Sequence, residues 1–572
     1  MKKKHQKIIA ILAAGLTLGF CACGRVTTET TTAGAEQQSA AAGAGENLTY
    51  ADMFSSRDKE AGYDETETVT IRLSGSAARS DGANVTIAGS TVTVTGEGTY
   101  LLTGSLENGS VVVDAGEEDK VQLVLENANI SNSGSAPLYV KCADKVVVTL
   151  ADGSENTLSN TGEFAAVDDN NVDACIFSKE DLTFNGGGSL TVTSETGHGV
   201  VSKDSLVFTG GSYTVNAARH ALAGKDDVRV QEGSFSLTCG QDALHASNDD
   251  DATLGFVYIE GGTFEISAAD DGIHAESELL INGGSIKISE CCEGLEGNTV
   301  TVNGGEIYIK SSDDGVNAAG GNDGSGQGGS GDSFGTGGGM PGPGMGGMMM
   351  DVDESCALEV NGGRLVINAE GDGLDSNGSL LVSGGEVYIS GPTNAGNGTL
   401  DYGTLDYGTG ATITGGVVIA ADAGGMAENF GSASTQGSML VSLSGSAGTP
   451  ITVTAADGSV LATFTPEKDY RCAVISAPGI AQGQTCTVTA GSESKTVEMT
   501  SLQYSELGGM GGMGGKMGGG QRGGEAGQSS GREGAFPGGA DGQAPTPPED
   551  GGNAPNFGGQ PPQRPDGGSA ET

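Results

Sequence analysis

One short unit recurs through the middle of this 572-residue chain and limits the fold more than any other feature. It consists of a polar residue, a small residue, an aliphatic residue and a second, usually polar residue. Its copies begin at His198, His220, Asp242, Asp271, Glu293, Asp314 and Asp372. The small residues are spaced by 22, 22, 29, 22, 21 and 58 positions, and the two long intervals contain an acidic stretch at 248–251 and a Gly/Met-rich segment at 319–352. Such periods are typical of folds in which each repeat stacks on the next.

Paired glycines between the copies form a second landmark, and alternating apolar residues flank them. The pairs are Gly210-Gly211, Gly261-Gly262, Gly283-Gly284, Gly304-Gly305, Gly362-Gly363, Gly384-Gly385 and Gly415-Gly416. Alternation with a period of two indicates strands, and paired glycines permit the positive φ angles of a tight corner. A 22-residue repeat is too short for a four-stranded blade, and the Leu/Asn consensus of leucine-rich repeats is missing. We therefore expect an all-β chain in which residues 67–425 form a parallel β-helix.

The chain after the repeat has two parts of different composition. Residues 426–503 contain short alternating segments and are predicted to form a small C-terminal β-sandwich or cap over the open end of the β-helix. Residues 504–572 are rich in Gly, Met, Pro and Gln, which predicts a disordered tail. Segment 319–352 has a similar composition and is predicted to be an insertion in the β-helix.

The N-terminus has the layout of a secretory signal peptide. Lysines at positions 2, 3, 4 and 7 precede an apolar run from Ile8 to Phe20 that is too short to span a bilayer. The following Ala22-Cys23 is similar to the lipobox of bacterial lipoproteins, so residues 1–23 are predicted to end at a lipidated Cys23. The alternative is ordinary cleavage without a lipid. Residues 24–66 would then form a flexible tether, and the protein would lie at the extracellular face of the bacterial cell membrane.

The charge of the chain excludes two classes of partner. With 27 basic and 74 acidic side chains the net charge is −47. Such a surface repels nucleic acid and anionic lipid, so we expect no nucleic-acid partner and membrane contact only through the N-terminal lipid. Among the ten cysteines, Cys472 and Cys486 are the one pair considered for a disulfide bridge.

Stacking of the repeats turns the polar positions into columns of like charge. Two unit charges ~4.8 Å apart repel by about 0.9 kcal/mol in bulk water, and by several times more at lower dielectric. A column of carboxylates is tolerable when a cation bridges its members, and hard oxygen donors favour Ca²⁺. The predicted calcium ligands are Asp271, Glu293, Glu296, Asp313, Asp314, Asp372 and Asp375, with Asp249 and Asp250 as a second candidate site. The alternative is a solvated acidic edge.

The four histidines of the repeat fall in the same two columns. His198 and His220 belong to the first column, and His245 and His274 lie in the second. A transition-metal site built from imidazoles needs three or four of them around one point. Two columns of two do not supply that, so no such site is expected.

Three stretches resemble one bacterial family in their amino-acid sequence as well as in their repeat pattern. They are GTYLLTG at Gly98–Gly104, ADKVVVTLADGSENTL at Ala143–Leu158 and IFSKEDLTFNG at Ile176–Gly186, with TPEK at Thr465–Lys468 near the end of the match. The chain over about 67–500 resembles the carbohydrate-binding, pectate-lyase-like β-helix proteins of cellulose-degrading clostridia. The resemblance implies a calcium-containing parallel β-helix that binds cellulose-like or acidic polysaccharides such as pectin. It brings no catalytic residues.

Binding is favoured over catalysis, with two alternatives left open. A pectate lyase uses Ca²⁺ and usually an arginine base, and the repeats contain only Arg219, Arg229 and Arg364. Stacked carboxylates also supply many chance pairs with the spacing of glycoside hydrolases. The alternatives are a lyase acting on polygalacturonate and a structural or adhesive surface protein. Because the chain has no tryptophan, the residues available to stack on sugars are Tyr308, Tyr388, Tyr402 and Tyr407.

Overall fold

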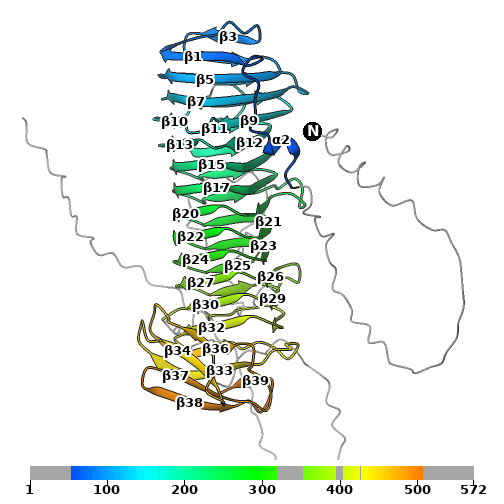
Figure 1. Ribbon diagram of the computed structural model, residues 1–572, viewed down its shortest axis with the longest axis vertical. Helices are drawn as coiled ribbons and strands as arrows, with labels where there is room; N and C mark the ends of the chain where they lie inside the picture. The colour runs from blue at the N-terminus through cyan, green and yellow to red at the C-terminus, as the bar shows by residue number, and fades with distance from the viewer. Residues whose placement is uncertain (1–52, 167, 320–351, 394–402, 425–426, 507–572) are drawn as a thin grey trace, which may run out of the picture. The chain divides into compact units, whose positions relative to one another are not determined.

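The computed structural model describes residues 53–166, 168–319, 352–393, 403–424 and 427–506. Within these residues the regular secondary structure is almost entirely β-strand, which confirms the all-β prediction, and most of the strands pair in parallel. Figure 1 shows the strands stacked one above another from β1 to β32. The predicted leader with Cys23, most of the insertion, Tyr402 and the predicted tail lie outside the described residues.

The strands form three parallel ladders, and each repeat contributes one segment to each ladder in turn. We call the three segments of one repeat a rung. The first ladder contains β4 (Thr91–Val94), β6 (Ser110–Asp114), β8 (Leu138–Cys142), β11 (Ala174–Ser178), β14 (His198–Ser202), β16 (Leu222–Gly224), β18 (Leu244–Ala246), the starts of β21 (Ile273–Ile281) and β23 (Leu295–Val302), β25 (Val316–Ala318) and β28 (Leu374–Ser376).

The second and third ladders lie on either side of the paired glycines. The second contains the starts of β5 (Gly98–Leu106), β7 (Lys120–Asn132), β15 (Ser205–Ala217) and β17 (Asp227–Cys239), the ends of β21 and β23, and β9 (Lys145–Leu150), β12 (Asp181–Gly186), β19 (Phe256–Ile259), β26 (Ala357–Val360), β29 (Ser379–Val382) and β31 (Gly410–Ile413). The third contains the ends of β5, β7, β15 and β17, and β10 (Glu155–Asn160), β13 (Ser189–Ser194), β20 (Thr263–Ala268), β22 (Ser285–Glu290), β24 (Glu306–Ser311), β27 (Arg364–Ala369), β30 (Glu386–Ser390) and β32 (Val417–Asp422).

Antiparallel strands cover both ends of the stack. At the N-terminal end β1 (Val69–Gly75) pairs with β2 (Ala77–Arg79), and β3 (Val85–Ala88) pairs with β4. At the other end β36 (Tyr470–Ser476) pairs with both β32 and β33 (Ser438–Gly445), and β39 (Gln503–Ser505) pairs with β33. A separate four-stranded sheet contains β34 (Ile451–Ala455), β35 (Val460–Phe464), β37 (Thr485–Ala490) and β38 (Glu493–Glu498).

The register confirms the predicted columns. The aliphatic residue of each copy pairs with its equivalent in the next rung, and all seven are at most 2% exposed: Val200, Leu222, Leu244, Ile273, Leu295, Val316 and Leu374. The core also contains an aromatic stack that low aromatic content gave no reason to expect. The rings of Phe184 and Phe208 stack at 5.1 Å, and those of Phe235 and Phe264 at 4.7 Å.

The glycines have two different structural roles. The second residue of each predicted pair has a positive φ, from 74° at Gly385 to 104° at Gly262, as expected for a tight corner. The small residue of the repeat is small for another reason. A Cβ at Gly294 would lie 2.3 Å from the carbonyl oxygen of Gly315 in the next rung, so close packing between rungs, rather than a bend, limits this position.

The two cysteines considered for a bridge lie in different sheets. Cys472 belongs to β36 and Cys486 to β37, and both thiols are free. The Cys472 thiol instead donates a hydrogen bond of 2.8 Å to the carboxylate of Asp422. The predicted pairing is therefore wrong.

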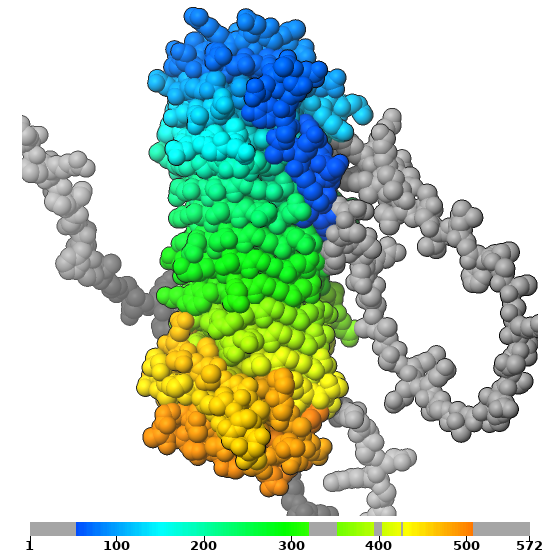
Figure 2. All heavy atoms as spheres, viewed as in Figure 1, coloured from blue at the N-terminus to red at the C-terminus, as the bar shows by residue number. Residues whose placement is uncertain are grey.

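An N-terminal segment, residues 53–61, lies against the side of the stack and is called the strap (Figure 2). It contains the four-residue helix α2 (Ser56–Lys59), and no helix in the described part of the chain is long and apolar enough to cross a membrane. The Asp58 carboxylate is buried and lies 2.6 Å from Lys145 Nζ, and it accepts a hydrogen bond of 2.7 Å from Thr183. The prediction of a tether over 24–66 is therefore wrong for the strap.

Replacement of Gly294 by alanine tests the packing between rungs. The added Cβ would meet the Gly315 carbonyl oxygen, and overpacking of this kind costs about 1–3 kcal/mol. We expect a lower melting temperature in thermal denaturation. At Gly134 an added Cβ has no atom within 4 Å, so the matched variant Gly134→Ala should melt like the wild type. Equal melting temperatures for all three proteins would contradict this explanation.

Replacement of Asp58 by alanine tests how the strap is held. The change leaves the Lys145 ammonium, which is only 14% exposed, without its carboxylate. Breaking a buried ion pair costs about 3–5 kcal/mol. We expect faster cleavage of the strap in limited proteolysis and faster amide exchange there. The control is Arg57→Ala, because the Arg57–Glu60 pair is largely exposed and contributes about 0–1 kcal/mol; equal cleavage of both variants would contradict the assignment.

Candidate functional site

The first residue of each copy is called the corner residue, and five of these residues accept a hydrogen bond from the backbone N–H of the next corner residue. His198 Nδ1 accepts from the His220 N–H at 3.2 Å, and His220 Nδ1 accepts from the Asp242 N–H at 3.1 Å. Asp242 Oδ1 and Asp271 Oδ1 accept from the following corner residues at 3.0 and 3.3 Å. The position therefore needs an acceptor, which His, Asp and Glu all supply. A carboxylate has a second oxygen that remains for other partners.

The four imidazoles form one continuous stack instead of two separate pairs. Ring centroids are 5.0 Å apart for His198 and His220, 4.1 Å for His220 and His245, and 4.9 Å for His245 and His274. Burial lowers the pKa of His198 to about 2 and, with the neighbouring His220, lowers that of His245 to about 4. The lone pairs of parallel rings do not converge on one point. The stack itself is therefore unsuited to holding a metal among its imidazoles.

Three of the predicted calcium ligands come together with one histidine, in what we call the mixed cluster. Asp271, Glu293 and Glu296 each place a carboxylate oxygen within 4.8 Å of the others. His274 Nδ1 lies 3.3 Å from Asp271 Oδ2 and contacts Glu296 Oε2. All three carboxylate residues are buried, with Glu293 only 1% exposed.

The charges in the mixed cluster shift the pKa values of its members. Burial, followed by the carboxylates of Asp242 and Glu296, raises the pKa of Asp271 to about 8 against the hydrogen bond with His274. Burial alone would lower the pKa of His274, but the hydrogen bonds to Asp271 and Glu296 raise it well above its ordinary value. Both shifts indicate that the site favours an added positive charge, whether a proton or a metal ion.

Three further predicted ligands form an aspartate cluster. Asp314, Asp372 and Asp375 also place carboxylate oxygens within 4.8 Å of one another. Asp314 Oδ1 accepts a hydrogen bond from the Asp372 N–H at 2.5 Å, so the corner pattern continues here. Burial and then the charge of Asp314 raise the pKa of Asp372 to about 10. The arrangement can bind a cation that is satisfied by oxygen atoms alone.

The remaining predicted ligands do not join either cluster. Asp313 is not part of the groups of three close ligand atoms found among the described residues. Asp249 and Asp250 are exposed, and the carboxylate of Asp250 lies 2.5 Å from Lys225 Nζ. The aspartates at 249 and 250 are therefore not part of either cluster. They lie at the surface, where Asp250 forms an ion pair with Lys225.

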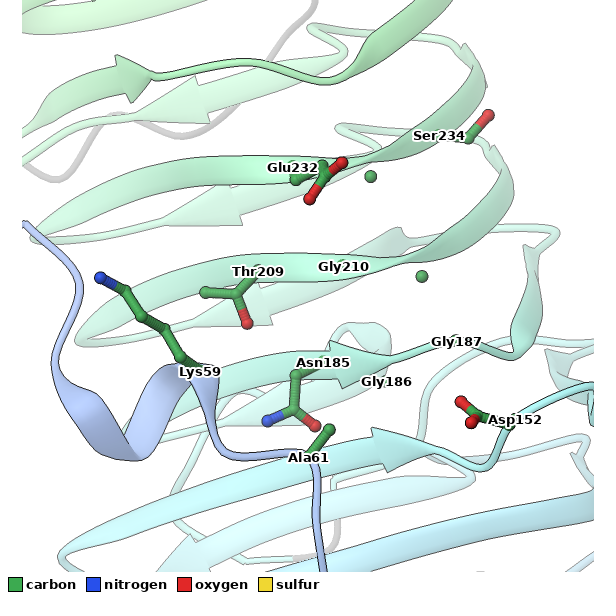
Figure 3. Close-up of a pocket in the computed structure, with 12 residues that line it drawn as sticks. Lys59, Ala61, Asp152, Asn185, Gly186, Gly187, Thr209, Gly210, Glu232 and Ser234 are labelled. Atoms are coloured by element: carbon green, nitrogen blue, oxygen red, sulfur yellow. The ribbon is translucent and has the colours of Figure 1, made fainter.

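A groove of about 510 Å³ lies where the strap crosses the turns between the second and third ladders (Figure 3). Lys59 and Ala61 of the strap line one side, and Asp152, Glu232 and Ser234 supply exposed polar groups. The remaining lining residues are Asn185, Gly186, Gly187, Thr209, Gly210, Gly211 and Gly233. Glycines in the wall leave the backbone accessible, and the volume is in the usual range for small-ligand sites.

Two side chains in the groove donate hydrogen bonds to the strap, and these donor groups are therefore not available to a ligand. Asn185 Nδ2 donates to the carbonyl oxygens of Asp58 and Glu60 at 3.0 and 3.1 Å. Thr209 Oγ1 donates to the Asp58 carbonyl at 2.7 Å. Sequence reasoning missed this groove, because the strap lies outside the repeat and no periodic signal marks its contacts. It also did not group His274 with the carboxylates of the mixed cluster, although His274 lies three residues after Asp271 in the repeat.

The arginines considered for lyase chemistry are paired with carboxylates. Arg219 Nη1 lies 3.5 Å from Asp173 Oδ2, and Arg229 Nε lies 2.6 Å from the buried carboxylate of Asp227. Arg364 Nε lies 3.5 Å from Glu386 Oε2. A paired guanidinium stays protonated and is a poor general base.

The tyrosines considered as sugar-stacking residues have partners within the chain. Tyr308 donates to Glu467 at 3.3 Å, and Tyr407 donates to the Asn429 carbonyl at 2.9 Å. The ring of Tyr388 stacks on Phe464 with centroids 5.2 Å apart. None of these three lines the groove.

Part of the chain is similar to proteins that are described as containing a carbohydrate-binding domain. Residues 88–331 match the model of a family described as carbohydrate-binding domain-containing protein. A protein of Acetivibrio thermocellus with the same description is 41% identical over 128 residues, which cover 22% of this chain. The match covers 45% of that relative, so this chain spans less than half the length of the curated protein it resembles.

A solved structure is also similar to part of the chain. It is described as the polysaccharide lyase-like protein from C. thermocellum in a gadolinium derivative, and its sequence is 32% identical. The match covers 42% of this chain and 93% of that chain, with a TM-score of 0.38.

The two clusters predict an unusual dependence of stability on pH. Because the pKa values of Asp271 and Asp372 are raised to about 8 and about 10, the metal-free folded state holds protons that the unfolded chain releases above about pH 4. The lowered pKa values of His198 and His245 act in the opposite direction, but only below the ordinary histidine pKa of about 6.5. The free energy of unfolding should therefore fall mainly as the pH rises from about 6.5 to 8. Thermal denaturation in chelator, and again with added divalent cation, measures this. A cation should restore stability mainly at the higher pH, where it replaces the protons.

Asp372→Asn separates this effect from the general acidity of the chain. Asparagine keeps an oxygen acceptor for the backbone N–H of Gly403 but has no charge to repel Asp314. We expect a weaker pH dependence in chelator than for Glu117→Gln, which removes one exposed charge. Identical pH dependence in the two variants would show that the aspartate cluster is not its source.

Proposed function

We propose that this chain is a polysaccharide-binding protein. The observation that supports the proposal most directly is the match of residues 88–331 to a carbohydrate-binding family model. The related A. thermocellus protein has the same description. The paired arginines favour binding over lyase chemistry, because none of the three is poised as a base.

The groove beside the strap is the proposed contact for the polysaccharide. It is lined by three exposed groups that suit sugar hydroxyls, since Asp152 and Glu232 can accept hydrogen bonds and Lys59 can donate them. Hydrogen bonds to charged groups are about twice as strong as neutral ones. The glycines let a sugar ring approach the backbone directly.

The charge of the groove favours a neutral, cellulose-like chain there. Two carboxylates against one ammonium in the groove, and a net charge of −47 for the whole chain, repel a polyanion. An acidic polysaccharide such as pectin would need a bridging cation. The two kinds of polymer are therefore expected to differ in their response to a chelator.

Calcium is proposed at the aspartate cluster. Asp314, Asp372 and Asp375 supply oxygen donors only, the type that Ca²⁺ binds in sets of six to eight. When bound, the ion would neutralise carboxylates from two successive rungs. The residues themselves keep those rungs in register through the Asp314–Asp372 hydrogen bond.

The architecture and location complete the proposal. The three ladders, joined rung after rung, support a parallel β-helix as the fold of the repeat region. The Ala22-Cys23 sequence supports lipid anchoring of Cys23 at the extracellular face of the cell membrane.

Retention on insoluble cellulose and on immobilised polygalacturonate tests the function. The mature full-length protein should be retained on at least one of the polymers. The double variant Asp152→Asn/Glu232→Gln should bind cellulose at least tenfold more weakly, because each change replaces a charged hydrogen bond of about 1.5–3 kcal/mol by a neutral one of about 0.5–1.5 kcal/mol. Glu117→Gln/Glu118→Gln removes two exposed charges elsewhere and should bind like the wild type.

Different outcomes would overturn different parts of the proposal. Absence of retention on both polymers would refute polysaccharide binding of this class. An equal loss in both double variants would refute the groove as the contact. If a chelator changes neither retention nor melting temperature, the calcium proposal is wrong and the polysaccharide proposal stands.

A further inference from the structure

We propose that the mixed cluster binds a divalent first-row transition metal, such as Zn²⁺ or Fe²⁺, and that Ca²⁺ binds only at the aspartate cluster. The two clusters lie at equivalent corners of the stack, yet their donor atoms differ. This inference does not depend on polysaccharide binding, and it replaces calcium by a transition metal at Asp271, Glu293 and Glu296.

The geometry brings four donors together from two rungs. Asp271 and His274 belong to one rung, and Glu293 and Glu296 belong to the next. The three carboxylates have oxygen atoms within 4.8 Å of one another, and His274 Nδ1 is directed at two of them. Donor atoms bonded to one metal ion at about 2.0–2.2 Å lie about 3–4.4 Å from one another, slightly closer than the 4.8 Å limit found here. After a small movement of the side chains, one ion in place of the Nδ1 proton can therefore contact an oxygen atom of each of the three carboxylates.

The balance of charge favours a cation at this place. Three ionised carboxylates and one protonated imidazole would sum to −2, so the cluster must take up a further proton or a metal ion. Asp271 is 9% exposed, Glu293 1% and Glu296 4%, so water screens these charges poorly. A buried cluster of like charges is strongly destabilised unless a cation joins it. This burial distinguishes the mixed cluster from an ordinary acidic patch at the surface.

The nitrogen donor decides the class of ion. Imidazole is a good ligand for Zn²⁺, Fe²⁺, Ni²⁺ and Cu²⁺, whereas Ca²⁺ takes oxygen atoms almost without exception. The side chain of His274 is only 12% exposed, and its Nδ1 contacts the carboxylates of Asp271 and Glu296. The equivalent position in the aspartate cluster is Asn317, because Asp375 corresponds to Glu296. One residue at one position of the repeat thus changes a hard oxygen site into a mixed site.

The neighbouring group of His220, Asp242 and His245 is a weaker candidate, although its donor atoms are also close. Its single carboxylate already lies between two imidazoles, at 3.2 and 2.7 Å. His220 Nδ1 accepts the backbone N–H of Asp242 and is not available to a metal without losing that bond. The charge and the acceptors of this group are satisfied within the protein.

Titration of the metal-stripped mature protein in the presence of excess Ca²⁺ tests the proposal, with any affinity-tag histidines removed. Excess Ca²⁺ saturates the all-oxygen site, so calorimetry with Zn²⁺ reports only sites that prefer a transition metal. We expect about one equivalent of Zn²⁺ to bind. Co²⁺ serves as a spectroscopic probe, because its visible absorption bands respond to the nitrogen ligand, and Zn²⁺ should displace it.

His274→Asn and His245→Asn form the matched pair of variants. The first removes the proposed nitrogen ligand and should weaken Zn²⁺ binding at least tenfold, since changes around a metal site commonly cost 10–100-fold. The second changes the same repeat position one rung earlier, where the ring faces Asp242, and should leave Zn²⁺ affinity within about twofold. Stabilisation of both variants by Ca²⁺ in thermal denaturation shows that they are folded.

Three results would overturn the inference. Absence of Zn²⁺ and Co²⁺ binding in excess Ca²⁺ would mean that Ca²⁺ or protons occupy the mixed cluster. Unchanged Zn²⁺ affinity in His274→Asn would place the metal elsewhere. An equal loss in both variants would place it in the imidazole stack.

Discussion

Backbone hydrogen bonds between rungs hold equivalent residues about 4.8 Å apart, and both the core and the polar corner depend on this spacing. On the inside it builds an unbroken column from Val200 to Leu374. At the corner the same spacing stacks polar groups that would repel each other if all were ionised. Most corner residues reduce this problem because they accept the backbone N–H of the next rung. That requirement explains why histidine and aspartate occupy one column, although their charges differ.

A second column lies three residues further along the chain, and its residues vary more in type than those of the first column. It contains Val201, Ala223, His245, His274, Glu296, Asn317 and Asp375. The chemistry of the corner therefore changes from rung to rung while the backbone stays constant. The groove uses another part of the rung, the turns near Gly186, Gly210 and Gly233, between the second and third ladders. Cation binding and polysaccharide binding are thus assigned to different edges of one stack.

The sequence predicted those features that follow from the repeat itself. The columns, the positive φ angles of the paired glycines and the grouping of Asp314, Asp372 and Asp375 depend on residues at fixed spacing. Features that depend on contacts outside the repeat could not be predicted. Asp58 meets Lys145 across 87 positions without any periodic signal. Cys472 and Cys486 are close in sequence, but they belong to two different sheets.

The position of the strap has a mechanical consequence. The chain meets the stack at its side, where residues 53–60 contact Lys145, Thr183, Asn185, Thr209 and Arg229 on four successive rungs. A pulling force that arrives through the residues before 53 would be shared among these rungs and would shear several bonds together. It would not peel β1 from the end of the stack one hydrogen bond at a time. Because forced unfolding is governed by the rate of unfolding, this side attachment would resist tension better than attachment at the first strand.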